Sequence, residues 1–186
     1  MNKKIVVLLV LVAIIIFFSV LVFQTSILKT KKIGLKFNLP RIMQLQSEAF
    51  GNNQKIPDKY TCNGANVNPP LLIFDAPQGA KTLALVVDDP DSLPSNWSHW
   101  LVWNIDPTTK SIIEDSVPLG ATEGMTDFGR AGYGGPCPPS GTHRYFFKLY
   151  ALDNILNLSS DADKKDLETA IDGHILDQAI LIGLYR

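Results

Sequence analysis

One stretch constrains the fold of this chain more than any other, the segment from Gly132 to Leu152. Residues 132–141 contain four glycines and three prolines, so they predict a bent, stiff loop and exclude a helix or a central strand. Residues 145–152 are aromatic and β-prone and predict a buried strand. With His143 and Tyr145 at the strand mouth, the segment indicates a small-ligand or anion site. The alternative is a proline-rich connection that leads into a core strand.

The beginning of the chain differs from the rest in hydropathy. A short basic tail, residues 1–4, precedes an apolar run at residues 5–23 that only Ser19 interrupts. That run is long enough to cross a hydrocarbon layer of about 30 Å. It is longer than the apolar region of a usual signal peptide, and no Ala-x-Ala cleavage site follows it. The sequence therefore favours a transmembrane anchor over a cleaved secretory signal, followed by a linker at residues 24–43.

Charge also divides the chain. Residues 1–43 carry seven Lys and Arg and no acidic residue, whereas residues 44–186 carry a net charge of −8. Basic residues after the apolar run favour a cytoplasmic domain, but the short Lys-Lys tail before it is typical of export. We expect a membrane-tethered, extracytoplasmic domain. An acidic domain argues against nucleic acid as a partner, and the basic linker suits either anionic lipid or solvent.

Residues 44–186 read as one domain of short strands. Apolar runs at 82–87 and 100–105 predict strands buried on both faces. A helix is expected at 161–171, capped by Asp161 or Asp163 and ended by Gly173. Turn residues every eight to twelve positions indicate a mainly β, antiparallel two-sheet sandwich with one or two helices near the C-terminus. Further strands are expected at 44–50, 71–74, 112–113 and 180–185.

Polar side chains gather where three of the predicted strands begin or end. Asp89 and Asp91 follow the 82–87 run. His99 and His143 each lie at the beginning of a predicted strand. If these strands are adjacent, the four side chains and Tyr145 meet in one place. Taken singly, an acidic loop is usually solvated and a lone histidine is usually a structural hydrogen-bonding residue.

Four motifs resemble those of one family, the phosphatidylethanolamine-binding proteins, also called Raf kinase inhibitor proteins, in their compact bacterial and archaeal branch. The resemblance covers about residues 44–186 with the motifs in the expected order. The motifs are Asp89-Pro90-Asp91 with Pro94, the strand His99-Trp100-Leu101-Val102-Trp103-Asn104-Ile105, the loop Gly135-Pro136-Cys137-Pro138-Pro139, and the element Gly141-Thr142-His143-Arg144-Tyr145. The apolar prefix departs from many relatives, so the resemblance gives no compartment.

The resemblance implies a large antiparallel sheet packed on a smaller one, with a surface pocket for phosphate head groups or phosphorylated side chains. The residues carried over to that pocket are Asp89, Asp91, His99, Trp100, Gly135, Pro136, His143 and Tyr145. In it, both histidines and the tyrosine would donate hydrogen bonds to an oxyanion, helped by N–H groups of 132–135. Asp89 would orient an imidazole, Trp100 would be a wall, and Arg144 would pair with a carboxylate as scaffold.

Other functions find less support in the sequence. No Gly-x-Ser-x-Gly elbow is present and no tight ligand spacing indicates a metal, so we expect a binding protein without enzymatic activity, metal or cofactor. The alternative is an inhibitor of a protein kinase or protease that uses the same pocket. Cysteines of similar, cytosolic-looking proteins favour free thiols at Cys62 and Cys137, with a disulfide as the alternative.

Overall fold

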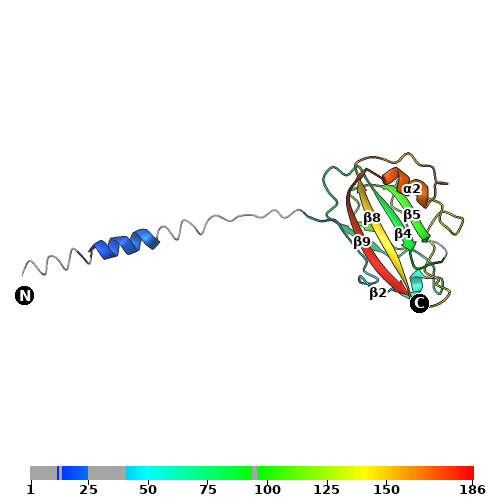
Figure 1. The fold of residues 1–186 in the computed structure, drawn as a ribbon, viewed down its shortest axis with the longest axis horizontal. Helices are drawn as coiled ribbons and strands as arrows, with labels where there is room; N and C mark the ends of the chain where they lie inside the picture. The colour runs from blue at the N-terminus through cyan, green and yellow to red at the C-terminus, as the bar shows by residue number, and fades with distance from the viewer. Residues whose placement is uncertain (1–11, 13, 25–40, 94–95) are drawn as a thin grey trace, which may run out of the picture. The chain divides into compact units, whose positions relative to one another are not determined.

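The structure is a computed structural model that describes residue 12 and residues 14–24, 41–93 and 96–186. The chain divides into two units, Met1–Pro40 and Arg41–Arg186. The second unit is a β-sandwich, and its large sheet carries the labels β9, β8, β4 and β5 in Figure 1.

Six strands form the large sheet in the order β2-β9-β8-β4-β5-β7. All neighbours are antiparallel except β2 and β9, which run parallel. The long central strands contain the apolar runs that the sequence singled out. Their bounds are β2 Gln54–Lys55, β4 Thr82–Asp89, β5 Trp97–Ile105, β7 Thr122–Glu123, β8 His143–Leu152 and β9 Ile175–Tyr185.

Three short strands form the small sheet in the order β1-β3-β6, and both pairs are antiparallel. Their bounds are β1 Gln44–Gln46, β3 Leu71–Phe74 and β6 Ser111–Ile112. Leu45 and Ile73 of this sheet pack with Leu85 and Phe147 of the large sheet in the main hydrophobic core. The mainly β sandwich predicted from the strand pattern is confirmed.

Residues 82–87 of β4 are all buried, as their apolar run predicts, and Asp88 and Asp89 at the end of the strand are buried as well. Its side chains alternate between two cores. Leu85 and Val87 join the main core between the sheets, whereas Ala84 and Val86 join a second core beneath the helix α2.

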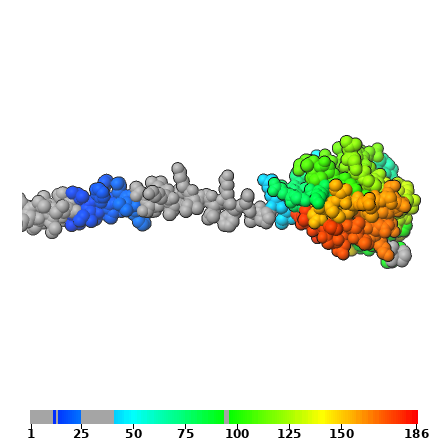
Figure 2. Space-filling model, turned by 90° about the horizontal axis from the view of Figure 1, so that it is seen from above, coloured from blue at the N-terminus to red at the C-terminus, as the bar shows by residue number. Residues whose placement is uncertain are grey.

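The helix α2, Lys164–Ile171, covers the outer face of the large sheet, and its orange segment lies at the surface in Figure 2. Asp163 is its N-cap, and Asp166 completes a capping box, each carboxylate accepting a backbone N–H of the other residue. Leu167 and Ile171, one turn apart, face the second core. Of the two caps that the sequence allowed, the structure therefore has Asp163. A single 3-10 turn, η1 (Asp58–Tyr60), precedes the loop with Cys62.

The prediction of a transmembrane helix at residues 5–23 is wrong for the part of that segment that the structure describes. Residue 12 and residues 14–24 are helical, and no helix among the described residues is long and apolar enough to span a bilayer. A crossing needs about 20 apolar residues in one helix. Residues 5–11 and 13 lie outside the described residues.

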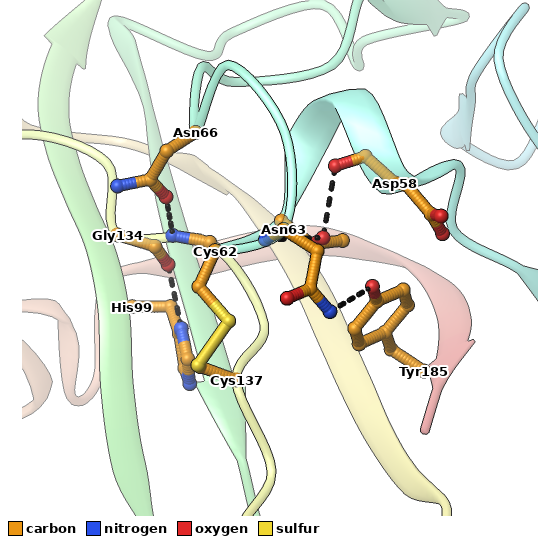
Figure 3. Close-up of a disulfide and its surroundings, with 10 residues drawn as sticks. Asp58, Cys62, Asn63, Asn66, His99, Gly134, Cys137 and Tyr185 are labelled. Carbon is orange, nitrogen blue, oxygen red and sulfur yellow. Dashed lines mark hydrogen bonds between the residues drawn. A yellow bond between two sulfur atoms is a disulfide. The ribbon is translucent and has the colours of Figure 1, made fainter.

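The expectation of free thiols is also wrong. Cys62 and Cys137 form a disulfide, with their Cα atoms 5.5 Å apart. The backbone N–H of Cys62 donates to the Pro136 carbonyl, so the loop after η1 and the proline-rich loop are held side by side. Figure 3 shows the disulfide near the His99 ring. No local sequence pattern reveals this pair, because the two residues are 75 positions apart and only the fold brings them together.

Candidate functional site

A pocket of about 220 Å³ opens at one edge of the large sheet. Strand β4 lies between β8 and β5 and runs antiparallel to both, so its end lies beside their beginnings. Four of the side chains predicted to converge there do so: Asp89, His99, His143 and Tyr145 all line the pocket. The rest of the lining is Ser92, Trp97, Phe128, Cys137, Pro138 and Pro139.

A β-bulge in β5 places His99 in this pocket. Val87 pairs with Trp100 but Asp88 pairs with Ser98, so His99 is the extra residue opposite β4. The residues His99 and Trp100 therefore face the same side of the sheet instead of alternating. His99 reaches the pocket, whereas Trp100 is fully buried in the main core, where its Nε1 donates to Glu123 at 2.6 Å.

His143 and Asp89 form a nearly buried pair at the pocket floor. The His143 Nδ1 lies 2.7 Å from Asp89 Oδ2, and the two side chains are 13% and 5% exposed. Asp89 Oδ1 accepts the backbone N–H of Asp91 at 2.9 Å, which fixes the carboxylate. Because a carboxylate can only accept, Nδ1 of His143 carries the hydrogen and Nε2 is its free nitrogen. Asp89 thus orients this imidazole, as the sequence led us to expect.

His99 is held differently, through its contact with a backbone carbonyl. Its Nδ1 lies 2.6 Å from the Gly134 carbonyl oxygen, so this nitrogen must donate. Burial is the main influence on the ring and lowers the pKa of His99, while the Gly134 carbonyl and nearby carboxylates act in the opposite direction. A neutral ring with a hydrogen on Nδ1 has a lone pair on Nε2. Donation to an oxyanion, as expected from the sequence, therefore requires protonation that burial disfavours.

Tyr145 carries the most informative atom in the pocket. The residue is 1% exposed, and its hydroxyl has no hydrogen-bond partner among the described residues. Burial, followed by the charge of Asp89, raises the pKa of Tyr145 above its usual range, so the phenol stays protonated. A buried hydroxyl without a partner costs about 1–3 kcal/mol unless a ligand or water satisfies it.

Aromatic rings wall the pocket. Phe128 makes edge-on contacts with Trp97 and His99, and His99 makes another with Tyr145 at a ring-centroid distance of 5.2 Å. Sequence reasoning missed Trp97 and Phe128 as lining residues. Trp97 lies two residues before His99 on one strand, so period-two alternation could have found it. Phe128 comes from a loop, and no local pattern indicates its position.

The glycine-rich loop supports the pocket, but two of its backbone N–H groups already donate to acceptors within the protein. The Gly134 N–H donates to the His99 carbonyl, and the Gly135 N–H donates to Asn66 Oδ1. Gly135 must lack a side chain, because a Cβ there would come within 2.6 Å of the Tyr60 carbonyl oxygen. These two N–H groups are therefore not available to an anion. Gly135 and Pro136 are buried behind the lining residues.

Asp91 also lies outside the pocket lining. Its carboxylate accepts two side-chain hydrogen bonds from Arg144, from Nε at 2.9 Å and from Nη2 at 2.7 Å, and one from the Arg144 backbone. The scaffold role expected of Arg144 is confirmed. The Arg144 hydrogen bonds lower the pKa of Asp91 to about 2.

Replacing Arg144 with Gln should raise the pKa of Asp91 from about 2 part of the way to its ordinary 3.8, since the guanidinium charge and its two hydrogen bonds are lost while the backbone hydrogen bond remains. A carboxyl group whose pKa is lowered in the folded state contributes stability to the fold. This stability is fully present above the pKa of the unfolded state and is lost as the pH falls through the pKa of the folded state. The wild-type ion pair should therefore fail between about pH 4 and pH 2. Carboxyl-carbon NMR titration measures this, and an Asp91 midpoint that stays near 2 in the variant would contradict it.

A metal centre is not part of the described site. No group of three or more His, Cys, Asp and Glu side chains in the described part of the chain could hold a metal ion.

Comparison with known proteins agrees with this geometry. A family model for phosphatidylethanolamine-binding proteins matches residues 46–186. A UPF0098 protein of Methanothermobacter thermautotrophicus is 48% identical over 149 residues, which cover 77% of this chain and 99% of that protein. A UPF0098 protein of Aquifex aeolicus is 45% identical over 152 residues, 78% of this chain and 89% of the relative.

Solved structures show the same fold. The crystal structure of a putative phosphatidylethanolamine-binding protein homologue from Chlamydia trachomatis superposes with a TM-score of 0.75 at 42% identity, covering 78% of this chain and 97% of that one. YbcL of E. coli, described as a member of the mammalian family, gives a TM-score of 0.75 at 29% identity, with 78% and 99% covered. Both the match over residues 46–186 and these likenesses place the chain in the phosphatidylethanolamine-binding protein family.

Proposed function

We propose that the pocket binds a small phosphate-like anion and that the protein is a binding protein, not an enzyme. The observation that carries this proposal is the Tyr145 hydroxyl, buried and without a partner among the described residues. It donates into a pocket whose floor is the His143–Asp89 pair. Buried polar groups in folded proteins almost always have a partner, so an unpaired donor at a pocket supports a ligand that accepts there.

His143 supplies the second donor. When protonated, it keeps its Nδ1–H on Asp89 and presents an Nε2–H to the ligand. The pair therefore offers a charge-assisted hydrogen bond, which is stronger than a neutral one.

The size and chemistry of the pocket favour a small ligand that is bound and not transformed. At about 220 Å³ the pocket is smaller than the 300–1,000 Å³ typical of drug-sized ligands. Apart from Tyr145, Ser92 supplies the only hydroxyl of the lining among the described residues, and no histidine or carboxylate there hydrogen-bonds its Oγ. An activated serine nucleophile would need such a base.

Replacing Tyr145 with Phe should weaken binding of O-phosphoethanolamine by about 1.5–3 kcal/mol, because one hydrogen bond to a charged group is lost. The fold should be as stable as before or more so, since the variant removes a buried hydroxyl that has no partner among the described residues. Isothermal titration calorimetry measures the affinity, and thermal unfolding measures the stability.

Tyr150 provides the matched control for this experiment. It lies on β8 as Tyr145 does, but it packs against the second core, on the other face of the sheet. Replacing Tyr150 with Phe should leave affinity unchanged. Equal binding by the wild type and the Tyr145 variant, or no binding of either phosphate or phosphoethanolamine by the wild type, would overturn the proposal.

A further inference from the structure

We propose that the Cys62–Cys137 disulfide is a redox switch for the pocket, which couples anion binding to the oxidation state of the two cysteines in both directions. The oxidised protein binds the anion more tightly, and the bound anion in turn makes the disulfide harder to reduce. This inference rests on the proposed function and concerns the regulation of the same pocket. The reductant that operates the switch is a dithiol.

The disulfide joins one wall of the pocket to a distant part of the chain. Cys137 lines the pocket together with the two prolines that follow it, whereas Cys62 belongs to the loop after η1 and does not line it. The two cysteines are 75 positions apart. In Figure 3 the bond bridges the two loops that carry them. Breaking it therefore changes the attachment of a wall that the ligand contacts.

Residues 137–139, which form this wall, have few other restraints. Two of the three are prolines, which have no backbone N–H, and no carbonyl group of the segment accepts a hydrogen bond from another described residue. The hydrogen bonds that join the two loops end just before the segment. The Pro136 carbonyl accepts from Cys62 at 3.1 Å, and the Gly135 N–H donates to Asn66 at 2.7 Å. We therefore expect residues 137–139 to gain freedom when the disulfide is broken.

Both cysteines are exposed, so a dithiol can reach the bond. A thiolate of the reagent attacks one sulfur atom, forms a mixed disulfide and releases the other cysteine, which takes up a proton. The second thiol of the reagent then closes the reagent's own disulfide and releases the remaining cysteine as a thiol. Two electrons and two protons pass from the dithiol to the cysteines, and no other group changes covalently.

The freed wall lowers affinity because a ligand must order it again on binding. Fixing the backbone of about one residue corresponds to roughly a tenfold loss of affinity. Linkage requires the same factor in the opposite direction, since a ligand that prefers the oxidised protein stabilises it. For a two-electron couple, a tenfold factor equals about 30 mV. Saturating ligand should therefore make the reduction potential of the disulfide about 30 mV more negative.

Two measurements on the full chain test this coupling. Calorimetric titration with O-phosphoethanolamine compares the affinity of the oxidised wild type with that of the wild type reduced by dithiothreitol, and we expect about tenfold weaker binding after reduction. Equilibration in dithiothreitol redox buffers, with and without saturating O-phosphoethanolamine, measures the shift in reduction potential. Thiol alkylation followed by mass spectrometry counts the reduced cysteines at each potential.

Two variants isolate the role of the disulfide. Cys62→Ser breaks the bond but leaves the Cys137 side chain in the pocket lining, so it should bind like the reduced wild type whether or not dithiothreitol is present. Asp88→Asn separates the lost restraint from lost stability. Asp88 is fully buried, pairs with Lys148 and Lys164 and lies outside the pocket lining. The oxidised Asp88→Asn protein should be destabilised, yet its folded fraction should retain wild-type affinity.

The outcomes distinguish this inference from the proposed function. Equal affinity of the oxidised and reduced proteins, or a reduction potential that O-phosphoethanolamine does not shift, overturns the redox switch while the proposed function stands. A loss of affinity in Asp88→Asn as large as that in Cys62→Ser also overturns the switch, because destabilisation alone would then account for both. Failure of the oxidised wild type to bind either O-phosphoethanolamine or inorganic phosphate overturns the proposed function itself.

Discussion

Replacing Cys62 and Cys137 together with serine should lower the free energy of unfolding by about 4–5 kcal/mol. The disulfide joins residues 75 positions apart. Closing a loop of that length removes much of the conformational entropy of the unfolded chain, and the chain-entropy relation gives about 4.5 kcal/mol at 25 °C. Urea or guanidinium unfolding of the oxidised protein and of the double variant measures the difference.

Reduction of the wild type by a dithiol should have the same effect, because Cys62 and Cys137 are both exposed and within reach of the reagent. The double serine variant is the control, since its unfolding midpoint should not respond to the reductant. Unfolding midpoints of oxidised and reduced wild type that coincide would contradict this account. Because Cys137 lines the pocket, we also expect reduction to weaken anion binding.

The reduced loop should not detach completely. Gly134 exchanges two hydrogen bonds with His99, and Gly135 donates to Asn66, in contacts that do not depend on the sulfur atoms. The part that reduction frees is residues 137–139, which line the pocket directly. Affinity should therefore fall while the His99 side of the pocket stays in place.

The sequence was sufficient for the strands and for the convergence of the site. The apolar run of β4, buried on both faces, and the aromatic run of β8, whose alternate residues are buried, both predict central strands. Polar residues at the ends of these strands then come together once the strands are adjacent and antiparallel. Asp89 and His143 meet for this reason.

Other parts of the site depend on contacts that no local pattern contains. Strict alternation cannot predict that His99 and Trp100 face one side, because the bulge arises from pairing with β4. The Gly134 and Gly135 N–H groups looked free in the sequence but find acceptors at His99 and Asn66, far away in the chain. The proton position on His99 depends on one such contact, with the Gly134 carbonyl.

The adjacent residues Asp88 and Asp89 of β4 face opposite sides of the sheet and have different roles. Asp89 faces the pocket, whereas Asp88 faces α2 and is fully buried. One oxygen of Asp88, Oδ2, accepts from Lys148 at 2.7 Å, from Lys164 at 2.8 Å and from Asn96 at 2.9 Å. The side chains of Lys148 and Lys164 are only 22% and 15% exposed. The Asp88 carboxylate therefore neutralises two largely buried ammonium groups.

Replacing Asp88 with Asn should therefore lower the free energy of unfolding by about 3–5 kcal/mol, the cost of breaking a buried ion pair by removing one partner. The loss arises because Lys148 and Lys164 would lie together, partly buried, without their shared counter-ion. Denaturant unfolding measures the loss. Asp58→Asn is the matched control, since Asp58 pairs with Lys55 on the surface, with side chains 60% and 68% exposed, and exposed ion pairs contribute little to stability.

Two further variants separate the charge effect from a packing effect. Adding Lys148→Met to Asp88→Asn removes one unpaired ammonium and should restore part of the lost stability, whereas a packing defect at Asp88 would not be relieved by a change at Lys148. Because the Asp88 side chain faces α2, the folded fraction of Asp88→Asn should still bind phosphate, unlike Asp89→Asn, which removes the partner of His143. A stability loss for Asp88→Asn no larger than that of Asp58→Asn would show that the buried carboxylate does not hold the two lysines in place.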